Sequence, residues 1–203
     1  MAIQAPWSDL LTDPLRRDHI AQVYRDERVL LDAVTLFAAE GLGRKEGVIL
    51  VATAPHLRAL EARLEAADLP VKGLRTWGQL VAVPADELLA VFMRDGLPNA
   101  MLFEAAVMAL IRKLRSAGYA HVRVFGEMVD LLWKDNLPAT ARLEEMWNEI
   151  VEAEQISLLC GYSHDTAEAG APARFPSRLS ALHTHVIPIE AGGNVRRPAS
   201  ASD

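Results

Sequence analysis

Residues 47–52, Gly-Val-Ile-Leu-Val-Ala, form an uninterrupted apolar run of the length of one strand. Such a run is typical of a parallel strand that is covered by helices on both faces. Strand-forming segments alternate along the chain with stretches in which apolar residues recur at helical spacing. The expected strands are 19–24, 47–52, 79–83, 122–125 and 156–162. The pattern predicts an α/β fold, a three-layer α/β/α sandwich around a mostly parallel sheet.

The chain is expected to form one domain with two short ends. Residues 1–18 are interpreted as a lead segment with one turn of helix, and residues 19–188 as a single α/β domain. Within this domain, 163–175 is expected to be a loop and 176–186 the last helix. Residues 189–203 have no apolar period and are expected to be a flexible tail.

Charge and composition exclude several classes of partner. The net charge is −6 and the pI is near 5.5, which argues against a nucleic-acid or anionic-membrane partner, because both normally require a clustered basic face. The chain has one cysteine, so it has no internal disulfide and fits a reducing compartment. No leader and no run of about 18 apolar residues is found. We therefore expect a soluble, cytoplasmic protein.

Glu127 lies where the strand at 122–125 ends and the chain turns at Gly126 into a helix. In open α/β sheets, ligands bind in the crevice above the carboxyl ends of the strands, so Glu127 is a candidate for ligand recognition. A glutamate in the first turn of a helix is also stabilised by the helix dipole without any function. Both interpretations remain open from the sequence.

Other polar side chains are expected at the same edge of the sheet. Tyr24 and Arg25 end the first strand, and Cys160 and Tyr162 belong to the last. Together with Glu127 they would line a pocket with aromatic walls and a few polar anchors, which suits a small, partly apolar ligand. The alternative is that both tyrosines are core-edge residues and that Cys160 is a small buried hydrophobe.

Two catalytic interpretations are disfavoured. A phosphate-binding loop needs glycines, a lysine and a hydroxyl, whereas residues 25–29 read Arg-Asp-Glu-Arg-Val. A nucleophilic Cys160 would need a histidine base, and no motif assigns one. We therefore predict no catalytic residue and name no cofactor.

A metal site is also not predicted, because no ligand spacing is diagnostic. His183 and His185 are two residues apart, which places them on opposite sides of the expected helix 176–186. The residues on which a metal site would draw are Cys160, Glu127, His19, His183 and His185.

Several short segments, taken in order, resemble the MEDS domain, the sensory domain of DcmR-type regulators of methylotrophs and methanogens. The resemblance covers about 17–188. The segments that carry it are His19-Ile20-x-x-Val23-Tyr24, Glu40-Gly41-Leu42 with Gly47, Gly78-Gln79-Leu80-Val81, Gly126-Glu127-Met128 and Leu159-Cys160-Gly161-Tyr162. It implies a fold related to RecA and KaiC ATPases whose phosphate-binding loop is lost. It also implies a role in sensing simple hydrocarbon derivatives, and it favours His19, Tyr24, Glu127, Cys160 and Tyr162 as ligand-binding residues.

Regulators of this family join the domain to a DNA-binding module, and other relatives join it to histidine kinases. The sequence shows neither module, so we expect a stand-alone, non-catalytic sensor that binds a small organic ligand and signals to a partner such as a histidine kinase or a regulator. The alternatives are a ligand-free interaction module and, third, a thiol-dependent or nucleotide-hydrolysing enzyme. The sequence leaves homo-oligomerisation open.

Overall fold

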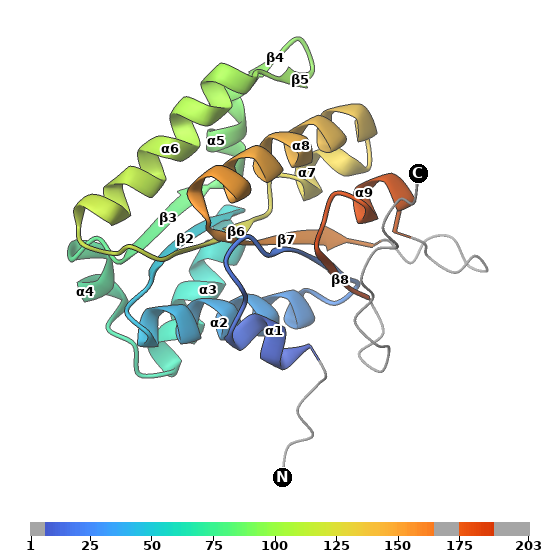
Figure 1. Cartoon of the computed structure of the whole chain (residues 1–203). Coiled ribbons are helices and arrows are strands. Elements are labelled where there is room, and N and C mark those ends of the chain that lie inside the picture. Colours follow the sequence, from blue (N-terminus) through green and yellow to red (C-terminus); the bar gives the residue numbers. More distant parts are fainter. Residues whose placement is uncertain (1–6, 165–174, 189–203) are drawn as a thin grey trace.

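The computed structural model describes residues 7–164 and 175–188. Its centre is a six-stranded sheet in the order β3-β2-β6-β7-β1-β8, in which every pairing is parallel (Figure 1). The expected α/β class and parallel sheet are confirmed. The strands are β1 (His19–Tyr24), β2 (Gly47–Ala52), β3 (Leu80–Pro84), β6 (Val122–Gly126), β7 (Ser157–Ser163) and β8 (His185–Ile187).

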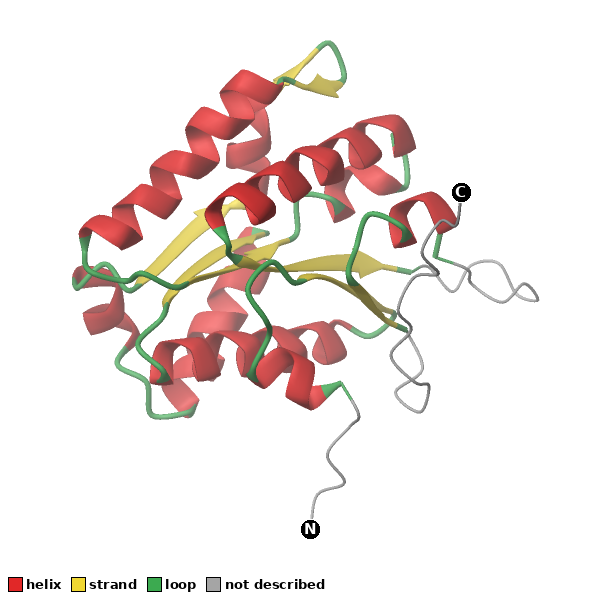
Figure 2. Ribbon diagram, viewed as in Figure 1, coloured by secondary structure: helices red, strands yellow, loops and turns green. Residues whose placement is uncertain are grey.

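Helices cover both faces of this sheet and make the three layers (Figure 2). The first four pack on one face and the last five on the other. On the first face lie α1 (Ser8–Thr12), α2 (Glu27–Gly43), α3 (Ala54–Ala66) and α4 (Val71–Thr76). On the second lie α5 (Ala85–Phe92), α6 (Ala100–Ser116), α7 (Asp130–Trp133), α8 (Leu137–Glu154) and α9 (Ser177–Ser180).

The apolar run of β2 explains why a strand in this position has no polar face. Val48 and Leu50 pack into the core under α2 and α3, while Ile49 and Val51 pack into the core under α5 and α6. Successive side chains of a strand point to opposite faces, so a strand between two helical layers must be apolar at every position.

The chain leaves neighbouring strands toward opposite faces at three places, β3/β2, β2/β6 and β7/β1. Helix α2 follows β1 and α3 follows β2 on the first face, whereas α5 follows β3, α7 follows β6 and α9 is the next helix described after β7, all on the second face. The carboxyl ends of these pairs are therefore topological switch points, and those of β2/β6 and β7/β1 are called here the first and second switch points. Ligands of open α/β sheets bind at such points.

The predicted last helix, 176–186, is wrong. The chain forms the short α9 and then β8, which pairs with β1 in the register Ile20 to His185. The hydroxyl of Thr184 fixes this pairing, because it accepts a hydrogen bond from the amide of His19 at 2.9 Å and donates one to the carbonyl of His19 at 3.0 Å.

The structure also contains short elements that the sequence pattern did not predict. Helix α4 was not expected. A tight turn at Asp95 and Gly96 joins the two-residue strands β4 (Met93–Arg94) and β5 (Leu97–Pro98). Both turn residues, Asp95 and Gly96, have positive φ, as a tight hairpin requires.

The lead segment contains the expected short helix, α1, and this helix is anchored to the domain by Arg123 of β6. The guanidinium of Arg123, 2% exposed, forms an ion pair with Glu46. It also donates to the carbonyls of Leu11 at 3.0 Å, Phe37 at 3.2 Å and Thr12 at 3.2 Å. The predicted boundaries 1–18 and 19–188 remain predictions, and the predicted tail lies outside the described residues.

In the described parts of the chain, no helix combines the length and the hydropathy that crossing a membrane would require.

Candidate functional site

The six predicted ligand-binding residues fall into two groups that the sheet separates. Tyr24 pairs in register with Ser163 and packs under α2, whereas the preceding residue of β7, Tyr162, points to the opposite face under α8. Glu127 lies with Tyr24 at the carboxyl edge of the sheet, and His19 and Cys160 lie with Tyr162. Arg25 is exposed just after β1. The structure thus places these six residues in two locations.

At the first switch point, Glu127 bridges the end of β6 to the start of α3. One oxygen of its carboxylate accepts from the amide of Thr53 at 2.7 Å, and the other lies 2.6 Å from Nδ1 of His56. The hydrogen bond with Glu127 raises the pKa of His56 against the opposing effect of burial, and the charges of Glu127 and Glu27 add to the rise. Glu127 therefore stabilises the protonated form of a histidine in the first turn of α3.

At the second switch point, the carboxylate of Asp130 joins β7, α7 and β1. One of its oxygens accepts from the amide of Ser163 at 2.6 Å, from its hydroxyl at 2.8 Å and from the indole N–H of Trp133 at 2.9 Å. The hydroxyl of Tyr24 reaches the other oxygen at 3.4 Å. Burial, and then the charge of Asp130, raises the pKa of Tyr24. Asp130 was missed by the sequence analysis.

The second group is a buried polar cluster, defined here as His19, Glu144, Cys160 and His183. It lies between the sheet and the helices α8 and α9, and each of its residues is at most 3% exposed. One ligand-type atom from each residue lies within 4.8 Å of the others. The hydroxyl of Tyr162 donates to Glu144 at the border of the cluster. Two strands, β1 and β7, helix α8 and the segment before β8 are far apart in the sequence and thus meet in one polar site inside an apolar core.

The distances inside the cluster are short. Nε2 of His19 lies 3.0 Å from Oε2 of Glu144 and 3.4 Å from Sγ of Cys160. Nε2 of His183 lies 3.4 Å from Oε1 of Glu144, and the thiol lies 3.9 Å from Oε2. The ring centroids of the two histidines are 4.2 Å apart.

The outer nitrogens of both histidines are held by other groups. Nδ1 of His19 lies 2.8 Å from the amide oxygen of Asn148, whose amide nitrogen donates to the carbonyl of Leu182 at 2.9 Å. Nδ1 of His183 lies 2.7 Å from the carbonyl of Leu179. Both rings are therefore oriented with Nε2 toward the cluster.

Burial shapes the titration of the cluster. It raises the pKa of the Cys160 thiol, and the charge of Glu144 adds to this effect. Burial alone would raise the pKa of Glu144 too, but the positive charges that His183 and His19 carry when protonated outweigh it and hold this pKa well below its usual range. Burial and the neighbouring His19 lower the pKa of His183. Without a further cation, the cluster thus combines a carboxylate, a protonated thiol and a His183 that resists protonation.

Of the residues considered for a metal site, the structure gathers His19, Cys160 and His183, and it adds Glu144 in place of Glu127. His185 is separate in β8, with Nε2 3.4 Å from a carboxylate oxygen of Asp18. The inference that His183 and His185 lie on opposite sides of a helix is corrected, because neither residue is helical. Glu144 was missed because it reads as a surface acid of an amphipathic helix.

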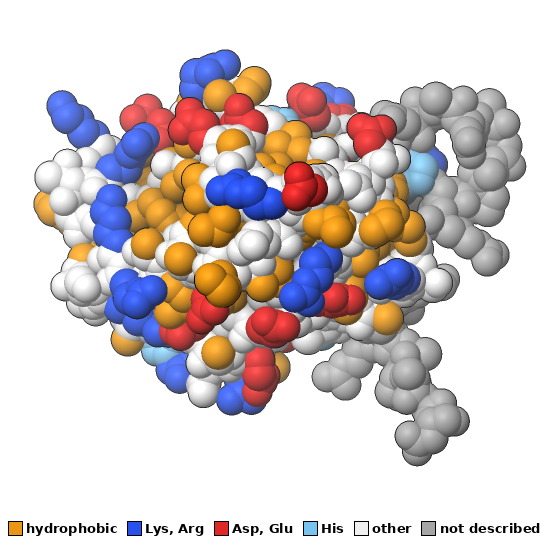
Figure 3. All heavy atoms as spheres, turned by 90° about the horizontal axis from the view of Figure 1, so that it is seen from above, with side chains coloured by type: hydrophobic (Ala, Val, Ile, Leu, Met, Phe, Trp, Pro, Cys, Tyr) orange, Lys and Arg blue, Asp and Glu red, His pale blue; other side chains and the backbone are white. Residues whose placement is uncertain are grey.

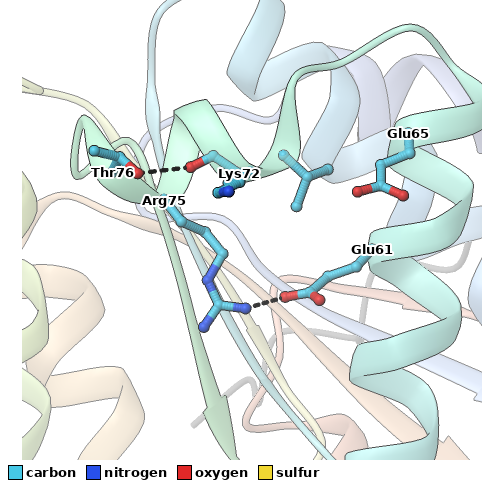
Figure 4. Close-up of a pocket in the computed structure, with 6 residues that line it drawn as sticks. Glu61, Glu65, Lys72, Arg75 and Thr76 are labelled. Carbon is cyan, nitrogen blue, oxygen red and sulfur yellow. Dashed lines mark hydrogen bonds and ion pairs between the residues drawn. The ribbon is translucent and has the colours of Figure 1, made fainter.

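A surface hollow of about 380 Å³ lies elsewhere, between α3 and α4 (Figure 4). Its lining is mainly charged, and an ion pair between Arg75 and Glu61 crosses it. None of the six predicted ligand-binding residues lines this hollow.

A comparison with models of known protein families found a match. The family model described as "MEDS: MEthanogen/methylotroph, DcmR Sensory domain" matches residues 18–175, which is more than half of the chain. The matched range includes both switch points and three residues of the buried polar cluster, and it ends before His183. No curated protein matches the sequence.

Proposed function

The chain belongs to the MEDS family of sensory domains, and on that premise we propose that it binds a small organic molecule, a hydrocarbon derivative, and signals its presence to a partner protein. The observation that carries the proposal is the concentration of polar side chains at the two switch points. There, Glu127 with His56 and Asp130 with Tyr24 follow the ends of neighbouring parallel strands.

The chemistry of this edge suits a small polar head on an apolar body. Because Nδ1 of His56 is engaged by Glu127, Nε2 is the nitrogen left for a ligand, with Glu27 3.9 Å away. The exposed guanidinium of Arg25 follows β1 at the same edge. An alcohol, aldehyde or carboxylate would find donors here, and the half-buried ring of Trp133 offers apolar surface.

The N-terminus of α2 supports a role other than nucleotide binding. Asp26 caps this helix, and its carboxylate accepts from the amide of Arg28 at 2.9 Å. A phosphate at this helix end would meet the carboxylates of Asp26 and Glu27. Together with the missing glycines and lysine, this arrangement favours a non-catalytic sensor.

A second candidate function, a ligand-free interaction module, is favoured by exposed apolar side chains beside the β4–β5 hairpin. Met101 is 79% exposed, Leu97 50% and Val91 49%. Figure 3, a view onto the layer of α5 to α9, shows hydrophobic side chains between the charged ones. In the sensor, such a surface would serve to contact the signalling partner.

A thermal-shift screen against small alcohols, aldehydes, halocarbons and carboxylates tests the proposal. A compound at 100 times its Kd adds about 2.7 kcal/mol, or several degrees in Tm for a chain of this size. The shift should be lost in Glu127→Gln and weakened in Arg25→Ala. Because the side chain of Arg25 is exposed, its removal should leave the fold unchanged. Glu149→Gln, an exposed acid on α8, is the matched control and should keep the shift. A wild-type protein that responds to none of these compounds would favour the interaction module.

A further inference from the structure

We propose that the buried polar cluster of His19, Glu144, Cys160 and His183 is a binding site for a divalent transition-metal ion of the zinc class. This site is separate from the edge proposed for the organic ligand, and it stands or falls independently of that function. The spacing of the donor atoms, the orientation of the imidazoles, the shortage of protons and the balance of charge in the cluster all favour such an ion.

The donor atoms already lie near tetrahedral spacing. Zinc binds nitrogen and oxygen at about 2.0–2.2 Å and sulfur at about 2.3 Å, so the ligands of a tetrahedral ion lie about 3.3–3.8 Å from each other. Nε2 of His19 and Sγ of Cys160 lie 3.0 Å and 3.9 Å from the same oxygen of Glu144, Oε2, and 3.4 Å from each other, while Nε2 of His183 lies 3.4 Å from the other oxygen, Oε1. The widest pair is within 4.8 Å, so a modest contraction would complete the shell.

The outer contacts fix the tautomer of each histidine. A backbone carbonyl accepts from Nδ1 of His183, so this nitrogen carries the proton. Asn148 directs its NH₂ to the carbonyl of Leu182, so its oxygen faces His19 and must receive a proton from Nδ1. In both neutral rings Nε2 is therefore a lone pair aimed into the cluster. A second group that holds the distal N–H is characteristic of metal-binding histidines.

The cluster then holds more acceptors than protons. The lone pair of His19 lies 3.0 Å from a carboxylate oxygen of Glu144, where two acceptors repel each other unless a cation lies between them. Nε2 of His183 is buried and has no hydrogen bond to any residue that the structure describes. Tyr162 supplies its proton to Glu144, which leaves only the Cys160 thiol as a donor within the cluster. A buried acceptor without a partner destabilises the folded state, and a metal ion would bind the lone pairs of all of these groups at once.

The charges also balance. A divalent ion, a thiolate, a carboxylate and two neutral imidazoles sum to zero, which suits an apolar core. Metal binding releases the thiol proton to solvent and forms four coordinate bonds without any change of oxidation state. Sulfur and nitrogen donors with one carboxylate favour Zn²⁺ over Mg²⁺ or Ca²⁺. Four protein ligands leave no open position, so the ion would join β1, α8, β7 and the segment before β8 as a structural centre.

The test uses the full chain, purified without a histidine tag or chelator. Metal analysis should find about one zinc per chain. After chelation, Co²⁺ should produce the thiolate charge-transfer band and the strong visible bands of a tetrahedral site. A wild-type protein that holds no zinc and takes up neither ion would overturn the proposal and leave the cluster as a network that shares a proton.

Variants locate the site. Asn148→Ala keeps all four ligands but releases His19, and it should weaken zinc binding about 10- to 100-fold. Cys160→Ser should abolish the charge-transfer band and weaken binding further. His121→Gln, which removes an exposed histidine, is the control and should bind like the wild type. Equal zinc affinity in Asn148→Ala, Cys160→Ser and the wild type would place the metal elsewhere and refute the assignment. If Cys160→Ser does not fold, the zinc affinity of Asn148→Ala and the cobalt spectrum of the wild type decide whether the metal binds at the cluster.

Discussion

The Arg123→Met variant should show how much the buried guanidinium contributes to holding α1 on the domain. Methionine keeps an apolar stem but removes the partner of Glu46 and three donors to backbone carbonyls. Breaking a buried ion pair costs about 3–5 kcal/mol, and each orphaned carbonyl adds to this cost. Water that enters beside a displaced α1 would form hydrogen bonds with these groups and offset part of this free-energy cost. We therefore expect a loss of about 3–5 kcal/mol, which lowers Tm by about 6–20 °C in a chain of this length.

Urea unfolding followed by circular dichroism measures this loss, and Arg44→Met is the matched control. Arg44 also pairs with an acid beside α1, Asp13, but its side chain is 44% exposed and that of Asp13 73%. Exposed pairs contribute about 0–1 kcal/mol, so the control should be close to the wild type. Arg123→Lys, which keeps the charge but loses the fork of donors, should fall between them. If Arg123→Met is no less stable than Arg44→Met, the buried contacts do not anchor α1 and the reasoning is refuted.

Three further outcomes are expected. In Glu127→Gln, the pKa of His56 should return toward its ordinary value in an NMR titration; an unchanged pKa would contradict the assigned cause. Because this pKa is raised in the folded state, the stability that it contributes is fully present below about pH 6.5 and is lost as the pH rises through the raised value. The loss of unfolding free energy in Glu127→Gln should accordingly be larger at pH 5.5 than at pH 9, as urea titrations at both values would show. Thr184→Val should cost about 1–3 kcal/mol, because the two hydrogen bonds of its hydroxyl to His19 disappear while the shape and the amide hydrogen bond are kept; no change in thermal unfolding would mean that the hydroxyl does not stabilise β8. Asp130→Ala should cost about 1.5–3 kcal/mol in urea, since its short hydrogen bonds to the half-buried donors of Ser163 and Trp133 are lost, and a value under 0.5 kcal/mol would argue that water replaces them.

The sequence alone predicted correctly those elements whose pattern of apolar residues is long enough to distinguish a strand from a helix. The apolar run at 47–52 and the strand formers at 19–24 predicted strands that the structure confirms. The prediction of a last helix at 176–186 was wrong because Leu179, Leu182 and Val186 share a helical spacing by coincidence. Strand β8 has only three residues, too few to show the alternating pattern of a strand. Its strand conformation depends on pairing with β1, a tertiary contact that local pattern does not encode.

The candidate sites were predictable only in part. Glu127 follows from its position after a strand, and the structure places it at the expected edge. Which polar groups share a face depends on register, because Tyr162 and Ser163 are adjacent yet serve different sites. Glu144 left a weak signal, since it lies four residues after the buried Thr140 and three before the buried Trp147 on the inner stripe of α8. The relation to RecA and KaiC ATPases and the identity of the ligand remain predictions.

Strand β8 also covers part of the sheet edge at which another molecule could pair. It borders the sheet and covers only Ile20 to Gln22 of β1, a long and fully buried strand. A very short edge strand offers few unpaired backbone groups to another molecule, whereas an open β1 would present a flat apolar template for edge-to-edge aggregation. A chain shortened at residue 175, where the family match ends, would lose β8 and open that edge. If such a fragment aggregates, the cause would be the exposed edge of β1. The aggregation would carry no information about the stability of the intact domain.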